Sequence, residues 1–114
     1  MTIAQAVGGE GGAINTIALA EICVGEAHPE SVAERIQAWG IQILSVPPDA
    51  AAPCAQAYQM YRKRRSEQSG KPAPLTPLPD FFIGAHALVR NYHLATGDVG
   101  RFKQYFSGVR LITP

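Results

Sequence analysis

The chain has 114 residues, of which 46% are hydrophobic and 17% are charged, and its formal net charge is +1. This length supports a single domain over residues 1–114 with one core, and the composition excludes a disordered chain. The near-neutral charge excludes a globally basic nucleic-acid binder, so any such surface must be local. No apolar run reaches the roughly 20 residues that span a bilayer, and no signal segment opens the chain. We therefore expect a cytoplasmic protein without membrane contact.

Hydrophobic periodicity and turn residues predict strands that alternate with helices. The N-terminal half is predicted to hold a strand at 14–17, a helix at 18–25, a helix from Pro29 to about Gly40, a strand at 41–46 and a helix at 50–65 capped by Asp49. The rest is predicted to hold a proline-rich loop at 66–79, a helix that begins at Pro79, a strand at 93–96, a helical turn at 99–106 and a strand at 109–113. This alternation indicates an α/β fold with a largely parallel sheet.

Three acidic residues follow or begin these predicted elements. Glu21 ends an apolar run, Asp80 lies in the first turn of its helix, and Asp98 follows the strand at 93–96. In α/β sheets functional groups gather beyond the carboxyl ends of strands, so the three acids could converge at one edge. Carboxylates are the ligands that Mg²⁺ and Mn²⁺ prefer, which suggests a phosphodiester-cleaving metal site. The alternative is a first-turn residue, a turn former and a surface acid that act separately.

Other side chains have simpler interpretations. We expect His86 to be a packed or hydrogen-bonded core histidine rather than a metal ligand, and Cys23 and Cys54 to be buried free thiols. Trp39 and the pair Tyr58 and Tyr61 are expected in the core or in an interface. The basic run at residues 62–65 is either a solvated helix end or a contact for RNA phosphates.

Four segments, taken together and in order, resemble the PIN-domain family, and most closely its VapC-type toxins. They are residues 14–21 (INTIALAE), 78–87 (LPDFFIGAHA), 94–98 (LATGD) with Arg101 and Phe102 after it, and 109–114 (VRLITP). The resemblance covers nearly the whole chain. It implies a PIN fold, which is a mostly parallel sheet of four to five strands flanked by helices.

The resemblance also implies an activity and its residues. It implies a Mg²⁺- or Mn²⁺-dependent endoribonuclease that is inhibited by a cognate antitoxin protein and is commonly a homodimer. By position, Glu21, Asp80 and Asp98 match the second, third and fourth acids of the family's metal site. Thr96 matches the hydroxyl residue that orients the last acid. Arg101 is placed to steady charge on the RNA phosphate.

One departure from the family pattern concerns the start of the fold. PIN domains begin with a central strand that ends in a metal-binding Asp, whereas no Asp precedes Asp49 here. We therefore expect an N-terminally truncated PIN-like domain without its first strand, whose place residues 2–7 or another subunit would fill. The two functional hypotheses are an active ribonuclease and a catalytically impaired binding module that retains antitoxin or RNA contacts.

Overall fold

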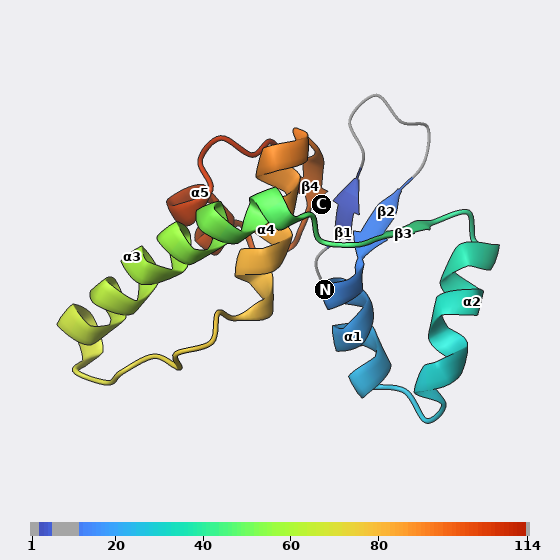
Figure 1. The fold of residues 1–114 in the computed structure, drawn as a ribbon, viewed down its shortest axis with the longest axis horizontal. Coiled ribbons are helices and arrows are strands. Elements are labelled where there is room, and N and C mark those ends of the chain that lie inside the picture. Colours follow the sequence, from blue (N-terminus) through green and yellow to red (C-terminus); the bar gives the residue numbers. More distant parts are fainter. Residues whose placement is uncertain (1–2, 6–11, 114) are drawn as a thin grey trace.

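Five α-helices and five short strands follow one another in the computed structural model, which describes residues 3–5 and 12–113 (Figure 1). The elements are β1 (Ile3–Gln5), β2 (Ala13–Asn15), α1 (Thr16–Val24), α2 (Val32–Ala38), β3 (Gln42–Leu44), α3 (Ala51–Ser69), α4 (Pro79–Arg90), β4 (His93–Ala95), α5 (Val99–Tyr105) and β5 (Leu111–Ile112). Short 3₁₀ turns precede α2 and α3. Within the described residues, no helix is both long and apolar enough to cross a bilayer.

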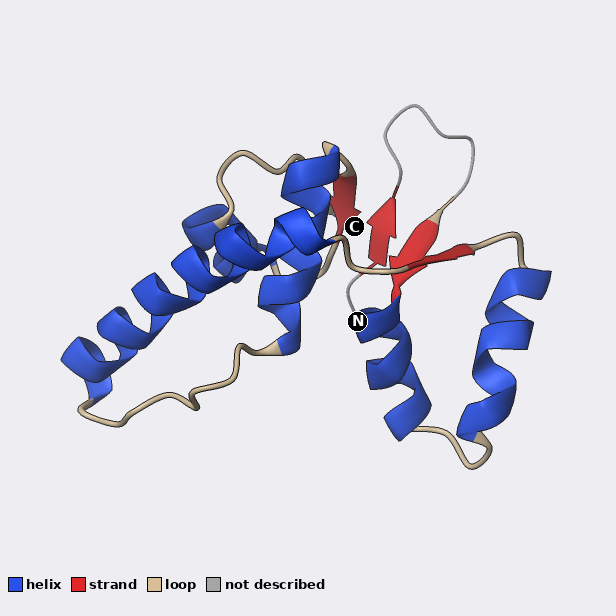
Figure 2. Ribbon diagram, viewed as in Figure 1, coloured by secondary structure: helices blue, strands red, loops and turns tan. Residues whose placement is uncertain are grey.

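The strands form two ladders rather than one continuous sheet (Figure 2). One ladder has the order β1-β4-β5, and the other pairs β2 with β3. The pairs β2–β3 and β4–β5 are parallel, as the alternation of strands and helices predicts. β1 lies beside β2 in space but pairs only with β4 among the described strands, with Ala4 opposite Leu94.

The position between β4 and β2 is therefore filled by an N-terminal strand. Its pairing with β4 is antiparallel, whereas the predicted sheet is mostly parallel. Three residues of the proposed replacement segment at 2–7 form β1. Residues 2, 6 and 7 and most of the glycine-rich segment that follows lie outside the described residues.

Helix α4 is the centre of the hydrophobic core. Phe81, Ile83, Ala85 and Ala87 are completely buried, and α3 and α1 both pack against the helix. Gly84 allows the Phe106 ring to lie directly on the helix backbone, because an added Cβ would be 2.5 Å from a ring carbon. The glycine thus serves close packing of the core.

A buried asparagine joins β2 and α1 to α4. Asn15 is 1% exposed, and its Oδ1 accepts the Ala18 backbone N–H at 2.9 Å, which caps α1. Its Nδ2 donates to His86 Nδ1 at 3.2 Å. An amide nitrogen can only donate, so Nδ1 accepts and the neutral ring carries its proton on Nε2. His86 is 2% exposed, which confirms that it is a hydrogen-bonded core histidine.

Several element boundaries and one helix cap differ from the sequence prediction. β2 ends at Asn15, whereas the sequence predicts a strand that continues to residue 17, because the Asn15 side chain caps α1. Helix α3 continues to Ser69, four residues beyond its predicted end, and Gly70 ends it in the left-handed conformation. Asp49 does not cap α3, and its carboxylate instead accepts from the Arg90 guanidinium at 2.7 Å.

Individual side-chain environments agree with the sequence expectations in part. Cys54 is buried and Cys23 is half-buried, and both are free thiols. Tyr58 is buried and stacks on Tyr61 with ring centroids 5.5 Å apart. Trp39 is 73% exposed, so it lies outside the core, and its expected position in an interface stays a prediction.

Replacing Asn15 by Ala should lower the free energy of unfolding by about 2–3 kcal/mol. A lost helix cap accounts for about 1 kcal/mol, and the buried His86 nitrogen left without its donor accounts for about 1–2 kcal/mol. Asn15→Ser, which keeps a capping oxygen, should lose less. Urea unfolding measures these values, and the exposed Gln37→Ala variant is the control. An Asn15→Ala variant as stable as the control would contradict the bridging role.

The stability of the fold should decrease as the pH falls below about 6.5. Burial, and secondarily the nearby Arg90 charge, lowers the pKa of His86 from its ordinary value. The unfolded chain then binds a proton more readily than the folded chain, so the contribution is complete above the unfolded pKa and is lost in acid. His86→Gln should flatten this dependence in thermal unfolding, and the exposed His28→Gln should not. Equal pH profiles for both variants would exclude His86 as the cause.

Candidate active site

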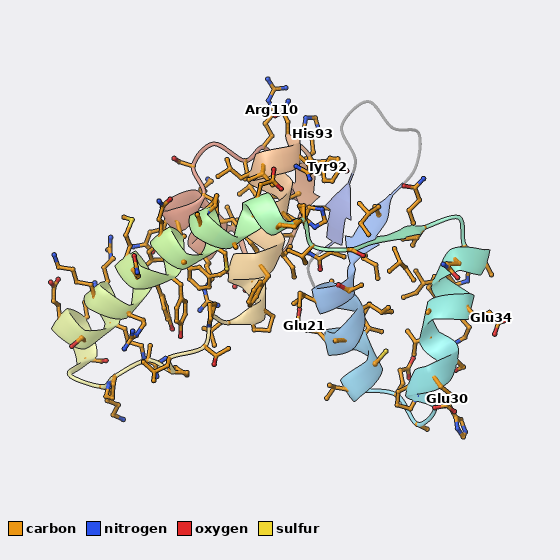
Figure 3. All side chains as sticks on the ribbon, viewed as in Figure 1. Glu21, Glu30, Glu34, Tyr92, His93 and Arg110 are labelled. Carbon is orange, nitrogen blue, oxygen red and sulfur yellow. The ribbon has the colours of Figure 1, made fainter. Side chains whose placement is uncertain are left out.

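The three predicted acids lie on or beside three separate elements. Glu21 lies on α1, Asp80 is the second residue of α4, and Asp98 follows β4 at the N-cap of α5. Figure 3 shows Glu21 projecting from α1 on the side of α4. The packing of α1 on α4, secured by the bridge from Asn15, sets the positions of Glu21 and Asp80.

The acids lie close enough to affect one another's protonation. Burial raises the pKa of Glu21 above its ordinary value, and the Asp80 charge raises it further. Burial also raises the pKa of Asp80, and the Asp98 charge contributes in the same direction. Asp80 is thus coupled electrostatically to both of the other acids, and the three are called the acidic row below. Such a row favours a bound cation or a proton.

Arg101 provides a cation to this row from within the chain. Its guanidinium lies 3.4 Å from the Asp80 carboxylate, and both side chains are mostly buried, at 28% and 21% exposed. The guanidinium also lies over the rings of Tyr61 and Phe81, at 5.1 and 5.5 Å from their centroids. Two aromatic faces and a carboxylate therefore hold Arg101 in place. The Arg101 charge lowers the pKa of Asp80, but burial has the larger effect.

Thr96 positions the backbone that carries Asp98. The hydroxyl is buried and accepts the Asp98 backbone N–H at 3.0 Å, and it lies 3.4 Å from the Asp98 carbonyl oxygen. This turn places Asp98 at the start of α5, where its exposed carboxylate makes no capping hydrogen bond. Thr96 thus acts on the backbone of Asp98 rather than on its carboxylate.

The donor chemistry of the site suits a hard dication, but the acids do not converge on one point. Carboxylate oxygens from Glu21, Asp80 and Asp98 are the kind of ligand that Mg²⁺ and Mn²⁺ take. Among the residues that the structure describes, no three His, Cys, Asp or Glu side chains come together closely enough to hold an ion. The Arg101 guanidinium lies against the central acid. The residues fit the ion by chemistry, and an ion bound at Asp80 would take the place of the Arg101 guanidinium as the partner of that carboxylate.

The residues that organise the site were not all found from sequence. Asn15 was read as a strand residue, although an Asn before a helix is a common capping signal. The sequence predicts that Arg101 steadies charge on the RNA phosphate, and in the structure its guanidinium pairs with Asp80. The aromatic support from Tyr61 and Phe81 depends on the packing of α3 and α5 beside α4, which leaves no local signal in the sequence.

Replacing Asp80 by Asn should raise the unfolding temperature at neutral pH. A raised folded-state pKa means that the fold favours the protonated carboxyl, so its stabilising contribution is present in acid and is lost as the pH rises through that pKa. An amide removes this effect, so the gain should shrink at acid pH. Asp49→Asn is the control with opposite sign, because the Arg90 hydrogen bond lowers the pKa of Asp49. Thermal melts in which Asp80→Asn is less stable than wild type at neutral pH would refute the assignment.

The chain is similar to known proteins in its fold, as a comparison with solved structures shows. No protein-family model matches the chain, and no curated protein is similar to it in sequence. The fold matches a chain in the crystal structure of DNA-bound VapBC from Salmonella typhimurium with a TM-score of 0.58 and 21% identity, over 89% of this chain and 74% of that one. It also matches a chain in VapBC2 from Rickettsia felis bound to a promoter DNA fragment, with a TM-score of 0.52 and 23% identity, over 89% of this chain and 73% of that one. The chain therefore has a fold found in VapBC toxin–antitoxin complexes, consistent with its resemblance to PIN-domain VapC toxins.

Proposed function

We propose that the chain is a VapC-like endoribonuclease dependent on Mg²⁺ or Mn²⁺. The observation that carries the proposal is the row of Glu21, Asp80 and Asp98, which three separate elements bring within electrostatic reach of one another. Mutual repulsion in such a row is relieved by a bound dication. These three carboxylates would hold the ion, which when bound supplies an activated water and neutralises charge on the phosphate.

The remaining residues of the site position the acids and the substrate. Thr96 fixes the turn that presents Asp98. The Arg101 guanidinium, which lies over the Tyr61 ring and beside Asp80, would contact a phosphate oxygen if Asp80 served as a metal ligand instead of as its ion-pair partner. Asp80 lies in the first turn of α4, where the helix dipole favours the ionised carboxylate.

A second candidate function is a binding module that does not cleave RNA. The observation in its favour is the ion pair between Arg101 and Asp80, which already neutralises the central acid. The lack of a three-ligand group among the described side chains points the same way. This alternative keeps the surfaces for RNA or antitoxin and loses only the metal.

The proposed partner is an antitoxin protein, and the proposed state of the toxin is a homodimer. The two solved structures compared above are VapBC complexes. Between α1 and α2 this chain has an apolar recess, with Glu26 and Arg35 at its rim and the exposed Trp39 at one side. We propose that an apolar segment of the antitoxin fills this recess. Its remaining lining residues are Ile14, Ile22, Val32, Ile36 and Ile41.

A cleavage assay on labelled single-stranded RNA distinguishes the enzyme from the binding module. Wild type should cleave only when Mg²⁺ or Mn²⁺ is present, and a chelator should abolish cleavage. Loss of groups that merely orient metal ligands costs about 10–100-fold, so Asp80→Asn and Asp98→Asn should each lose at least about 100-fold. Glu34→Gln, an exposed acid on α2, should cleave as wild type does. Equal background cleavage by wild type and Asp80→Asn would leave the binding module as the function.

A further inference from the structure

A basic groove runs from the acidic row along α3 and α5. Two adjoining recesses share four lining residues, so they form one continuous depression. The shared residues are Tyr61, Arg64, Gln68 and Tyr105. One recess continues to Asp98, Arg101 and Gln104, and the other continues to Arg65, Ser69 and Lys71. The groove therefore begins at one of the proposed catalytic acids and leads away from it.

The charge in this groove is strongly positive although the chain is almost neutral. Arg64, Arg65, Lys71 and Arg101 line it, and Asp98 is the one acid in its lining. The formal net charge of the whole chain is only +1. General basicity therefore does not explain the concentration of cations, which indicates a site for an anion that is longer than one phosphate.

Three of the four cations are held by neighbouring side chains. Arg65 donates to the Tyr61 hydroxyl at 3.2 Å, and Arg101 lies over the ring of the same tyrosine at 5.1 Å. The Arg64 guanidinium lies against the Gln104 side chain, whose amide oxygen accepts from it at 2.7–2.9 Å when the amide is turned toward it. Arginines fixed in this way lose little side-chain entropy when they bind phosphate.

The lining also favours a strand with unpaired bases. Tyr105 is half-buried and lines both recesses, so part of its ring is open to the groove. Its neighbours are the Tyr61 and Phe81 rings, which support it at centroid distances of 5.9 and 5.6 Å. A supported aromatic ring among cations is the arrangement on which bases of single strands stack.

We propose that this groove binds the backbone of single-stranded RNA and guides it to Asp98. Arg64, Arg65 and Lys71 contact successive phosphates, and Tyr105 stacks on a base. The choice of RNA as the polyanion rests on the proposed ribonuclease function. The groove itself rests on its own charge and geometry, so it can be tested without cleavage.

The test measures binding of a short fluorescein-labelled oligouridylate to the full chain by fluorescence anisotropy, with a chelator present and over a series of salt concentrations. The double variant R64Q/R65Q removes two proposed phosphate contacts. Its affinity should fall at least tenfold at low salt, and its salt slope should fall by about 1.4, since a single strand gives about 0.7 per phosphate contact. Arg64→Gln alone, at an exposed position, should show about half of the change in slope.

Lys63→Gln is the matched control. Lys63 is on the same helix and carries the same charge, but it lines neither recess. It should bind the oligonucleotide as wild type does, and circular dichroism should show that all variants remain folded. If Lys63→Gln lost as much affinity as R64Q/R65Q, binding would reflect non-specific attraction to the charged helix, and the proposal would be overturned. Tighter binding of polyglutamate than of RNA would also overturn it, because the groove would then recognise an acidic protein.

The outcome separates the groove from the nuclease activity. If wild type fails to cleave RNA but R64Q/R65Q loses binding, the groove stands and the catalytic proposal fails. If wild type cleaves RNA and R64Q/R65Q binds with wild-type affinity and salt slope, the groove proposal is wrong and the catalytic one stands.

Discussion

The arrangement of the site depends on one buried side chain, the Asn15 amide. Its oxygen starts α1 and its nitrogen bonds His86 in α4, so a single residue sets the direction of one helix and its contact with another. Glu21 lies six residues after Asn15 and Asp80 six residues before His86. A buried amide that satisfies two partners is costly to displace, because each partner would remain without a hydrogen bond. The spacing of these two acids is thus fixed by a contact that involves neither of them.

The sequence allowed prediction of most helices and strands because their signals are local. The Pro79 start of α4 and the alternation of apolar segments with helices needed no tertiary information. The errors lie where a side chain or a glycine decides the boundary, as at Asn15 and at Gly70. The pairing of β1 with β4 joins residues about ninety positions apart, and its antiparallel direction has no local signal.

The sequence was enough to predict which residues belong to the candidate site, but not the contacts between them. The predicted elements and the resemblance single out Glu21, Asp80 and Asp98, and in the structure the Asp80 charge acts on the pKa of Glu21 and the Asp98 charge on that of Asp80. The ion pair of Arg101 with Asp80 depends on how α5 packs against α3 and α4, and so do the aromatic faces that hold this arginine. These contacts explain why acidic residues of the right kind do not form a preassembled ligand set.

The division of the strands into two ladders has a mechanical consequence. Glu21 lies on α1, which directly follows β2 of one ladder. Asp80 lies on α4, which precedes β4 of the other ladder, and Asp98 follows β4. Among the described strands, β1 and β2 lie side by side without pairing. The two ladders are therefore held against each other by side-chain packing and by the hydrogen bond of the Asn15 amide to His86. Loss of the Asn15 amide would therefore allow Glu21 to shift relative to Asp80 and Asp98 while both ladders stay intact.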